Sequence, residues 1–181
     1  VSKIGYFPIV AISLTNQLKD SLTELTVTWQ LSGDLLKGEQ VIVTLLGFYR
    51  GPSFSVSAAS FLTIKASVNA AEYMESAAWD PVAQTITFIS ARAVSSSMTL
   101  VATFEVEQEL YTPTAGISDT ATTMTIQTNA AASPVGQQTI IITSSSLVPF
   151  VTKAEIAFIS SDNARQMVST SNPKLIQLNP G

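Results

Sequence analysis

Apolar and polar residues alternate over short stretches of this chain, and the clearest stretch covers residues 25–31. Leu25, Val27, Trp29 and Leu31 occupy every second position there, with threonine or glutamine between them. Side chains two residues apart lie on the same face of a β-strand. The pattern therefore predicts a strand that turns these four apolar side chains towards a core and the polar ones outward.

Similar patterns predict further short strands, separated by turn residues rich in Gly, Pro, Ser and Asp. These strands cover residues 11–16, 40–46, 54–56, 61–68, 85–89, 98–107, 122–128 and 138–143. Residues 40–46 are apolar on both faces for part of their length, which predicts a central strand. In 98–107, Leu100, Ala102, Phe104 and Val106 are expected to face inward. Residues 70–78 favour at most a single helical turn, because Ala, Glu and Met are good helix formers.

About nine short strands with almost no helix predict an all-β fold, an antiparallel β-sandwich that is immunoglobulin-like in general shape. A closed barrel is the alternative. We expect an N-terminal extension over residues 1–8, the sandwich over 9–146, and a C-terminal extension over 147–181.

The C-terminal extension repeats the start of the fold. Residues 7–10 (Phe-Pro-Ile-Val) precede the first strand, and residues 148–151 (Val-Pro-Phe-Val) precede a similar apolar stretch at 157–163. A surplus first strand needs a sheet edge, because unpaired backbone N–H and C=O groups are costly to bury. We expect the next copy of the same protein to supply that edge.

Strand exchange of this kind uses backbone hydrogen bonds for affinity and alternate side chains for specificity. Predicted strands at 154–160 and 174–178, with a loop at 163–172 between them, make the C-terminal extension the first candidate donor. The N-terminal extension is the second, and a fold-back of 147–181 as the last hairpin of its own sandwich is the alternative to exchange. The candidate interface residues are Lys153, Ala154, Ile156, Phe158, Leu175, Ile176, Leu178, Ile4, Tyr6 and Phe7.

The composition is apolar and poor in charge. Hydrophobic residues make up 46% and charged residues 12% of the 181, and the mean hydropathy is +0.33. No apolar run approaches the ~18–20 residues of a membrane span, so we expect no membrane insertion. The net charge of −4 comes without a basic patch, which argues against nucleic acid as a partner. Such a surface is expected to be covered by copies of the chain, by glycan or by another partner.

Cysteine and histidine are both absent from the sequence. This excludes disulfides, thiolate and imidazole metal ligands, cysteine nucleophiles and histidine general bases. We expect no cofactor and no enzymatic activity. The one acidic pattern is Glu105, Glu107 and Glu109, which in a strand would share a face at ~6.5–7 Å spacing. That pattern could bind Ca²⁺ or resemble a glycosidase pair, but a solvated outer face is the favoured interpretation.

Aromatic residues and hydroxyls give the remaining candidates. Trp29 and Trp79 are expected in the core, whereas the group Tyr6, Phe7, Phe48, Tyr49 and Phe54 is expected to include exposed interface anchors. The sequence has no Asn-x-Ser/Thr sequon. Possible O-glycan sites are Thr112 and Ser133, each of which precedes a proline.

Several runs of this sequence also follow a known family pattern of an alternating strand, a leucine, a Gly-acid turn, an apolar strand and Gly-Phe. These runs are residues 12–14, 25–29, 35–48, 84–88, 100–106 and 112–116. Together they resemble the Juk-type β-sandwich domain of extracellular filament subunits, which also occurs as tandem repeats in large surface proteins of algae and other protists. The resemblance covers residues 9–146 and carries no catalytic residues.

The resemblance implies a structural, extracellular protein, and we expect a secretory signal to have been removed before Val1. The predicted function is a subunit of an extracellular filament that polymerises head to tail by exchanging a terminal strand. The alternative is a monomeric adhesion or carbohydrate-binding module of a larger surface protein. A hydrolase that uses Glu105, Glu107 or Glu109 is the third and least favoured hypothesis.

Overall fold

The structure is a computed structural model that describes residues 5–117, 124–144, 154–155, 165–169 and 175–178. The chain divides into two compact units, Val1–Ser145 and Ser146–Gly181. The first unit is an antiparallel β-sandwich, so the predicted fold class is confirmed.

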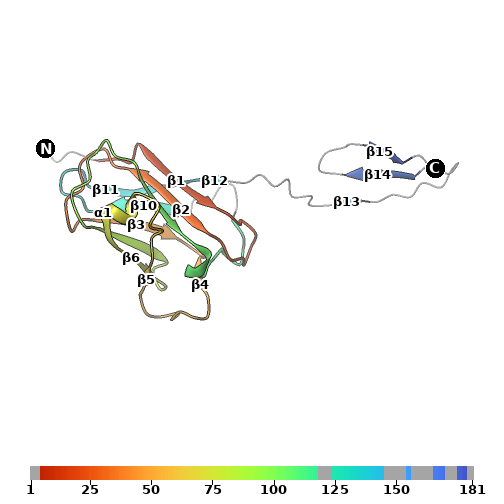
Figure 1. The fold of residues 1–181 in the computed structure, drawn as a ribbon, viewed down its shortest axis with the longest axis horizontal. Coiled ribbons are helices and arrows are strands. Elements are labelled where there is room, and N and C mark those ends of the chain that lie inside the picture. The colour runs from red at the N-terminus through yellow and green to blue at the C-terminus, as the bar shows by residue number, and fades with distance from the viewer. Residues whose placement is uncertain (1–4, 118–123, 145–153, 156–164, 170–174, 179–181) are drawn as a thin grey trace. The chain divides into compact units, whose positions relative to one another are not determined.

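One layer of the sandwich is a six-stranded sheet in which every neighbouring pair is antiparallel. In spatial order its strands are β11 (Val135–Thr139), β10 (Met124–Thr128), β3 (Gln40–Leu45), β7 (Thr85–Ser90), β6 (Met74–Asp80) and β5 (Ser60–Leu62). The strand β3 has a neighbour on each side, as predicted from its apolar residues on both faces (Figure 1).

The other layer is a four-stranded sheet. In spatial order its strands are β12 (Ile141–Ser144), β1 (Ile9–Leu14), β2 (Leu25–Gln30) and β8 (Leu100–Phe104). The strand β12 runs parallel to β1, and the other two pairs are antiparallel. The chain crosses from one sheet to the other at Ile140, which is buried and donates its N–H to the Met124 carbonyl at 3.0 Å. The sequence predicted a single strand over 138–143, so this change of sheet is a correction.

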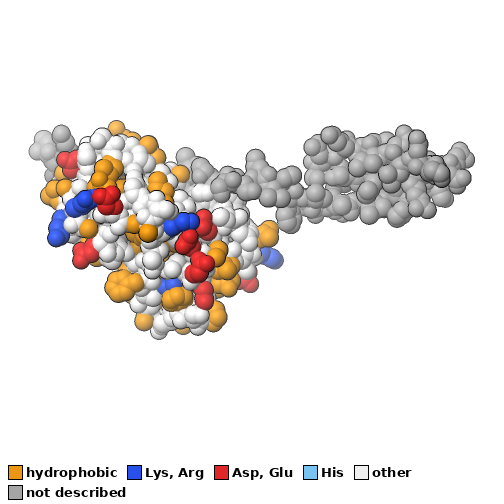
Figure 2. Space-filling view, viewed as in Figure 1, with side chains coloured by type: hydrophobic (Ala, Val, Ile, Leu, Met, Phe, Trp, Pro, Cys, Tyr) orange, Lys and Arg blue, Asp and Glu red, His pale blue; other side chains and the backbone are white. Residues whose placement is uncertain are grey.

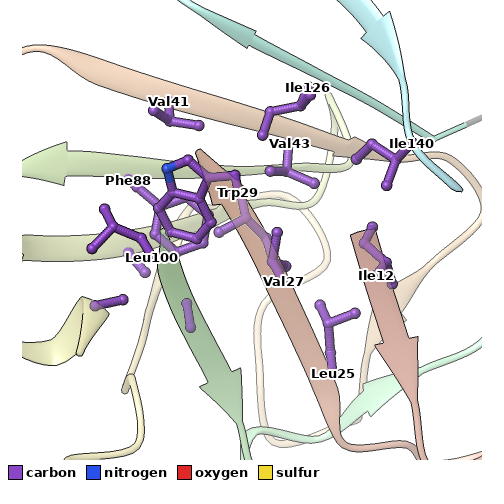
Figure 3. Close-up of a cluster of buried hydrophobic side chains, with 14 of the residues drawn as sticks. Ile12, Leu25, Val27, Trp29, Val41, Val43, Phe88, Leu100, Ile126 and Ile140 are labelled. Carbon is purple, nitrogen blue, oxygen red and sulfur yellow. The ribbon is translucent and has the colours of Figure 1, made fainter. Parts of the chain in front are cut away.

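The core lies between the two sheets, where apolar side chains from both layers meet (Figure 3). Leu25, Val27 and Trp29 of β2 are buried as their alternation predicts, and so is Leu31 just beyond the strand. The Trp29 ring packs on Phe88 of the opposite sheet with 4.8 Å between ring centroids. Burial of such side chains stabilises the fold by roughly 25 cal/mol for each Å² of apolar surface removed from water.

Four short elements lie outside the two sheets of the first unit. They are β4 (Tyr49–Arg50), β9 (Leu110–Tyr111), the helix α1 (Ala70–Tyr73) and the 3-10 helix η1 (Val106–Gln108). The strands β4 and β9 pair with each other. No helix of the described residues is long and apolar enough to cross a membrane.

The described residues of the second unit form three strands of a separate antiparallel sheet. They are β13 (Ala154–Glu155), β14 (Arg165–Ser169) and β15 (Leu175–Leu178), in that order. The strand at β15 was predicted, but β14 occupies part of a stretch that the sequence analysis assigned to a loop. That assignment is wrong, because β14 pairs with β13 on one side and with β15 on the other.

Two strand predictions in the first unit are wrong. Residues 54–56 form a loop, and of the strand predicted at 61–68 only the part in β5 exists. Residues 74–80 form the strand β6 instead of continuing a helical turn, because Tyr73 ends α1 and Met74 is already extended. The expected inward position of Val106 is also wrong, since η1 interrupts the strand and leaves that residue 42% exposed.

Candidate functional site

The described part of the N-terminal extension is attached to its own sandwich. Phe7 donates its N–H to Gln138 Oε1 at 3.0 Å and accepts from Gln138 Nε2 at 3.1 Å. Its side chain is 3% exposed and belongs to the core. Tyr6 is 59% exposed, and its carbonyl accepts the N–H of Ser32 at 2.9 Å. The proposal of Phe7 as an exposed anchor is therefore corrected, while Tyr6 stays at the surface and Ile4 lies outside the described residues.

The C-terminal candidates fall in the second unit. Ala154 lies in β13 opposite Ser169. Leu175, Ile176 and Leu178 lie in β15, which pairs with β14 along its whole length. The other three candidates, Lys153, Ile156 and Phe158, lie outside the described residues. The residues after the sandwich therefore include strands, as the exchange hypothesis requires of a donor.

The outer edge of β8 is covered by a segment of its own domain. The Asn69 Nδ2 donates a hydrogen bond to the Thr99 carbonyl, and the Asn69 Oδ1 accepts one from the Val101 N–H, both at 2.8 Å. Lys65 donates its N–H to the Thr103 carbonyl at 2.9 Å. These contacts use the groups that a neighbouring strand would need, which protects the edge from pairing with another chain.

Asn69→Asp is expected to lower the free energy of unfolding by about 1 kcal/mol. The new carboxylate still accepts from the Val101 N–H but faces the Thr99 carbonyl without a proton to donate. Urea unfolding of residues 1–145 measures the change. The matched variant is Asn69→Ala, which loses both bonds; an Asn69→Asp chain as stable as the unaltered one contradicts this account.

A different edge is open beside β6. The strand β5 pairs with β6 only through Ala77, Ala78 and Trp79. Further along, a groove of about 230 Å³ lies between the first half of β6 and the residues that continue β5; it is lined by Leu62, Thr63, Ile64, Ala71, Met74, Glu75, Ser76 and Ala77. The groove thus lies beside the first half of β6, where β5 no longer pairs with it.

The outer faces of the sandwich are almost without charge. Among the ten strands of its two sheets, the charged residues are Glu75 and Asp80, both in β6. The Asp80 side chain stabilises the turn that follows β6, because its Oδ1 accepts a hydrogen bond from the Val82 N–H at 2.8 Å. On the face in Figure 2 the charged side chains form a few small groups between broad neutral areas. Neutral sheet faces of this kind suit packing against another neutral surface.

The three glutamates do not share a strand face, so their predicted arrangement is wrong. Glu105 pairs with Lys65 at 2.9 Å. Glu107 lies in η1, and Glu109 has a left-handed backbone with φ of 51° and accepts the Ser53 hydroxyl at 2.7 Å. The described residues hold no group of three acidic side chains placed to bind a metal.

Both predicted O-glycan sites are buried, which corrects that assignment for the folded domain. Thr112 is fully buried, and its Oγ1 donates to the Leu18 carbonyl and accepts from the Ser21 N–H at 2.9 Å. Ser133 is 4% exposed beneath Gly33, where an added Cβ would lie 2.6 Å from the Ser133 Cβ. Neither hydroxyl has room for a sugar.

The aromatic predictions are confirmed for Trp29 and Trp79, which are both in the core. Phe48 is fully buried, which corrects its assignment to an exposed group, and Tyr49 and Phe54 are half-buried. The most exposed aromatic side chain on the sheets was not selected from the sequence: Phe61 of β5 is 77% exposed. Its position between Ser and Leu gave no signal of outward orientation.

Sequence reasoning also missed Arg50, which is 5% exposed. Its Nε donates to the Gln108 carbonyl at 2.9 Å, and its Nη1 donates to Ser60 Oγ at 2.8 Å. The guanidinium carbon lies 3.1 Å from the centroid of the Phe54 ring. Burial lowers the pKa of Arg50, and the nearby Glu109 opposes that shift. The only available signal was an arginine between aromatic residues in a chain with few charges.

Comparison with protein-family models gives no match. Comparison with curated proteins gives no relative either. The support for a function therefore comes from the geometry of this chain, namely its terminal strands, its sheet edges and its neutral faces.

Proposed function

We propose that this protein is a structural subunit of an extracellular filament, which polymerises head to tail by exchanging a terminal β-strand between neighbouring copies. The observation that carries the proposal is the C-terminal unit. The strands β13, β14 and β15 follow a sandwich whose ten sheet strands all come from residues 9–144. A β-forming segment at the end of a complete sandwich is what a donor needs.

The groove beside β6 is the candidate acceptor on the sandwich. It is lined by Ser76 of β6 and has an apolar side at Leu62. Each apolar side chain that a donor strand buries there contributes ~1.5–3 kcal/mol, before the cost of ordering the strand. Such a contact joins different surfaces on the two copies, so it forms an open helical array unless it closes into a ring.

The neutral outer faces support the same proposal. A chain with a mean hydropathy of +0.33 and almost uncharged sheets has surface that neighbouring copies can cover. The exposed apolar residues Val56 and Phe61, at 84% and 77% exposure, add to that surface. An extracellular location is part of the proposal.

The second candidate is a monomeric adhesion or carbohydrate-binding module, and Phe61 is the observation that favours it. An exposed aromatic ring on a sheet edge is a surface on which a sugar ring can stack. This candidate needs a soluble monomer, whereas the filament proposal needs a polymer.

Removing residues 146–181 is expected to abolish polymerisation and leave a folded monomer. The full chain should sediment as a heterogeneous polymer and show filaments by electron microscopy, while residues 1–145 should sediment as a single small species that keeps a β-sheet circular dichroism spectrum. The core residues of the sandwich all lie between Phe7 and Ile140, so the shortened chain keeps them.

A full-length variant separates loss of the donor from loss of the fold. Ile156→Asp combined with Phe158→Asp places two charges on the alternate positions of the candidate donor and should give monomers. The matched control is Val82→Asp in the exposed turn after β6, which should still polymerise. A monodisperse 19.2 kDa species from the unaltered chain, or filaments from residues 1–145, would refute the proposal.

A further inference from the structure

Two tyrosines stack at one end of the sandwich. Tyr49 of β4 and Tyr111 of β9 lie directly opposite each other in an antiparallel ladder. Their ring centroids are 5.2 Å apart and their planes differ by 13°. Directly opposite residues project from the same side of the ladder, and both side chains are half-buried. The two phenols are therefore held face to face and remain accessible from solvent.

An acidic side chain is hydrogen-bonded to one of these phenols. The Tyr49 hydroxyl donates a hydrogen bond to Asp20 Oδ1. Asp20 is held in a left-handed backbone conformation with φ of 54°, and its N–H donates to the Pro113 carbonyl at 3.2 Å. The hydrogen bond to Asp20 raises the pKa of Tyr49 to about 12, with smaller contributions from desolvation and from the charge of Asp20. At neutral pH, Tyr49 is a neutral phenol whose proton points at a carboxylate.

We propose that Tyr49 and Tyr111 form an oxidative cross-linking site, at which the two phenols couple to dityrosine and Asp20 accepts the Tyr49 proton. A phenol that loses an electron becomes a strong acid. Its oxidation is therefore easiest where a base is hydrogen-bonded to the hydroxyl and can accept the proton. Asp20 provides that base at Tyr49, and the stacked ring of Tyr111 provides the coupling partner.

The reaction balances with a peroxide as the two-electron oxidant, used by a peroxidase in two one-electron steps. Each tyrosine loses one electron and its hydroxyl proton and becomes a phenoxyl radical. The two radicals form a carbon–carbon bond between the ring carbons next to their oxygens. The hydrogens on those carbons then move to the oxygens, which restores two phenols. Hydrogen peroxide takes up the two electrons and two protons and becomes two molecules of water.

Stacked rings suit the bond-forming step. The unpaired electron of a phenoxyl radical occupies orbitals perpendicular to the ring plane, so two nearly parallel rings present these orbitals to each other. The product would join β4 to β9 covalently, beyond the backbone pairing of Tyr49 with Tyr111 and Arg50 with Leu110. The inference does not depend on polymerisation, because both tyrosines belong to the same sandwich.

The test treats the full chain with a haem peroxidase and hydrogen peroxide at neutral pH, followed by denaturation and mass spectrometry. The expected product is a single chain whose mass is lower by two hydrogens, with dityrosine fluorescence and a cross-linked peptide pair that contains Tyr49 and Tyr111. The other two tyrosines, Tyr6 and Tyr73, serve as internal controls. Tyr6 is 59% exposed, so it reports on coupling that depends on exposure alone.

Variants separate the roles of the three residues. Tyr49→Phe and Tyr111→Phe should each abolish the intrachain product, while Tyr73→Phe should leave it unchanged. Asp20→Asn should slow the coupling by at least about tenfold, because the amide holds the ring but accepts no proton. Asparagine tolerates the left-handed backbone of Asp20, so the fold should be kept. In an alkaline absorbance titration the same variant should lower the pKa of Tyr49 from about 12.

Coupling between chains through Tyr6 in place of the Tyr49–Tyr111 product would overturn the proposal. So would an unchanged coupling rate in Asp20→Asn when its titration shows the lowered pKa of Tyr49. A Tyr111→Phe chain that still gives the same intrachain product would overturn it as well.

Discussion

Replacing Phe88 by alanine is expected to lower the free energy of unfolding by about 3–5 kcal/mol. Phe88 of β7 is fully buried between the two sheets. Its ring packs on Trp29 at 4.8 Å and on Phe104 at 5.9 Å, so one substitution removes both aromatic contacts. The cavity would lie where the layers meet (Figure 3) and cannot collapse without moving a strand. Because a domain of this size is stable by only ~5–15 kcal/mol, the loss is a large share of the total.

The matched control is Phe61→Ala, the same chemical change at a ring that is 77% exposed on β5. Its expected effect is within about 0.5 kcal/mol, because an exposed side chain leaves no cavity. Urea unfolding of residues 1–145, followed by circular dichroism and tryptophan fluorescence, measures both variants. Similar losses for the two variants would show that Phe88 does not hold the layers together as described.

The parts of the fold that the sequence predicted are those with strict alternation. The strand β2 has apolar residues at every second position, and those positions are buried; Met124 and Ile126 of β10 behave in the same way. Alternation is a local property, so it survives any arrangement of neighbouring strands. The β-sandwich class follows from many such strands with short turns between them.

The errors occur where a strand depends on its neighbours. The strand β6 contains Met74, Glu75 and Ser76 without clear alternation, and its pairing with β7 shifts between Met74 and Ser76. The crossing of the chain at Ile140 was also hidden, because β11 and β12 read as one continuous strand. The two strands are distinguished only by their partners: β11 pairs with β10 in one sheet, and β12 pairs with β1 in the other.

The candidate sites depend even more on long-range contacts. The pairs Tyr49 with Tyr111 and Asn69 with Val101 join residues far apart in the sequence. The hydroxyls of Thr112 and Ser133 look like loop hydroxyls next to proline, yet the fold buries both. The sequence shows which residue types are present, but it does not show which of them the tertiary contacts remove from the surface.

Replacing Arg50 by methionine is expected to lower the free energy of unfolding by about 2–3 kcal/mol. The buried guanidinium donates to the Gln108 carbonyl, to Ser60 Oγ and to the Phe61 carbonyl at 2.8–3.2 Å. It thereby joins β4 to η1 and to β5. Methionine fills similar volume but leaves these acceptors without a donor, and the unpaired carbonyls account for most of the loss.

The matched control is Arg92→Met. Arg92 also stacks on an aromatic ring, with its guanidinium carbon 4.0 Å from the Tyr73 centroid, and pairs with Glu72. Its side chain is 46% exposed, so water replaces the lost contacts and the expected loss of stability is much smaller than at Arg50. Arg50→Lys should recover less than half of the loss at position 50, because a single ammonium group cannot reproduce a planar fork of donors. The argument depends on the burial of Arg50 and the exposure of Arg92. Equal losses of stability in urea unfolding for Arg50→Met and Arg92→Met would therefore contradict it.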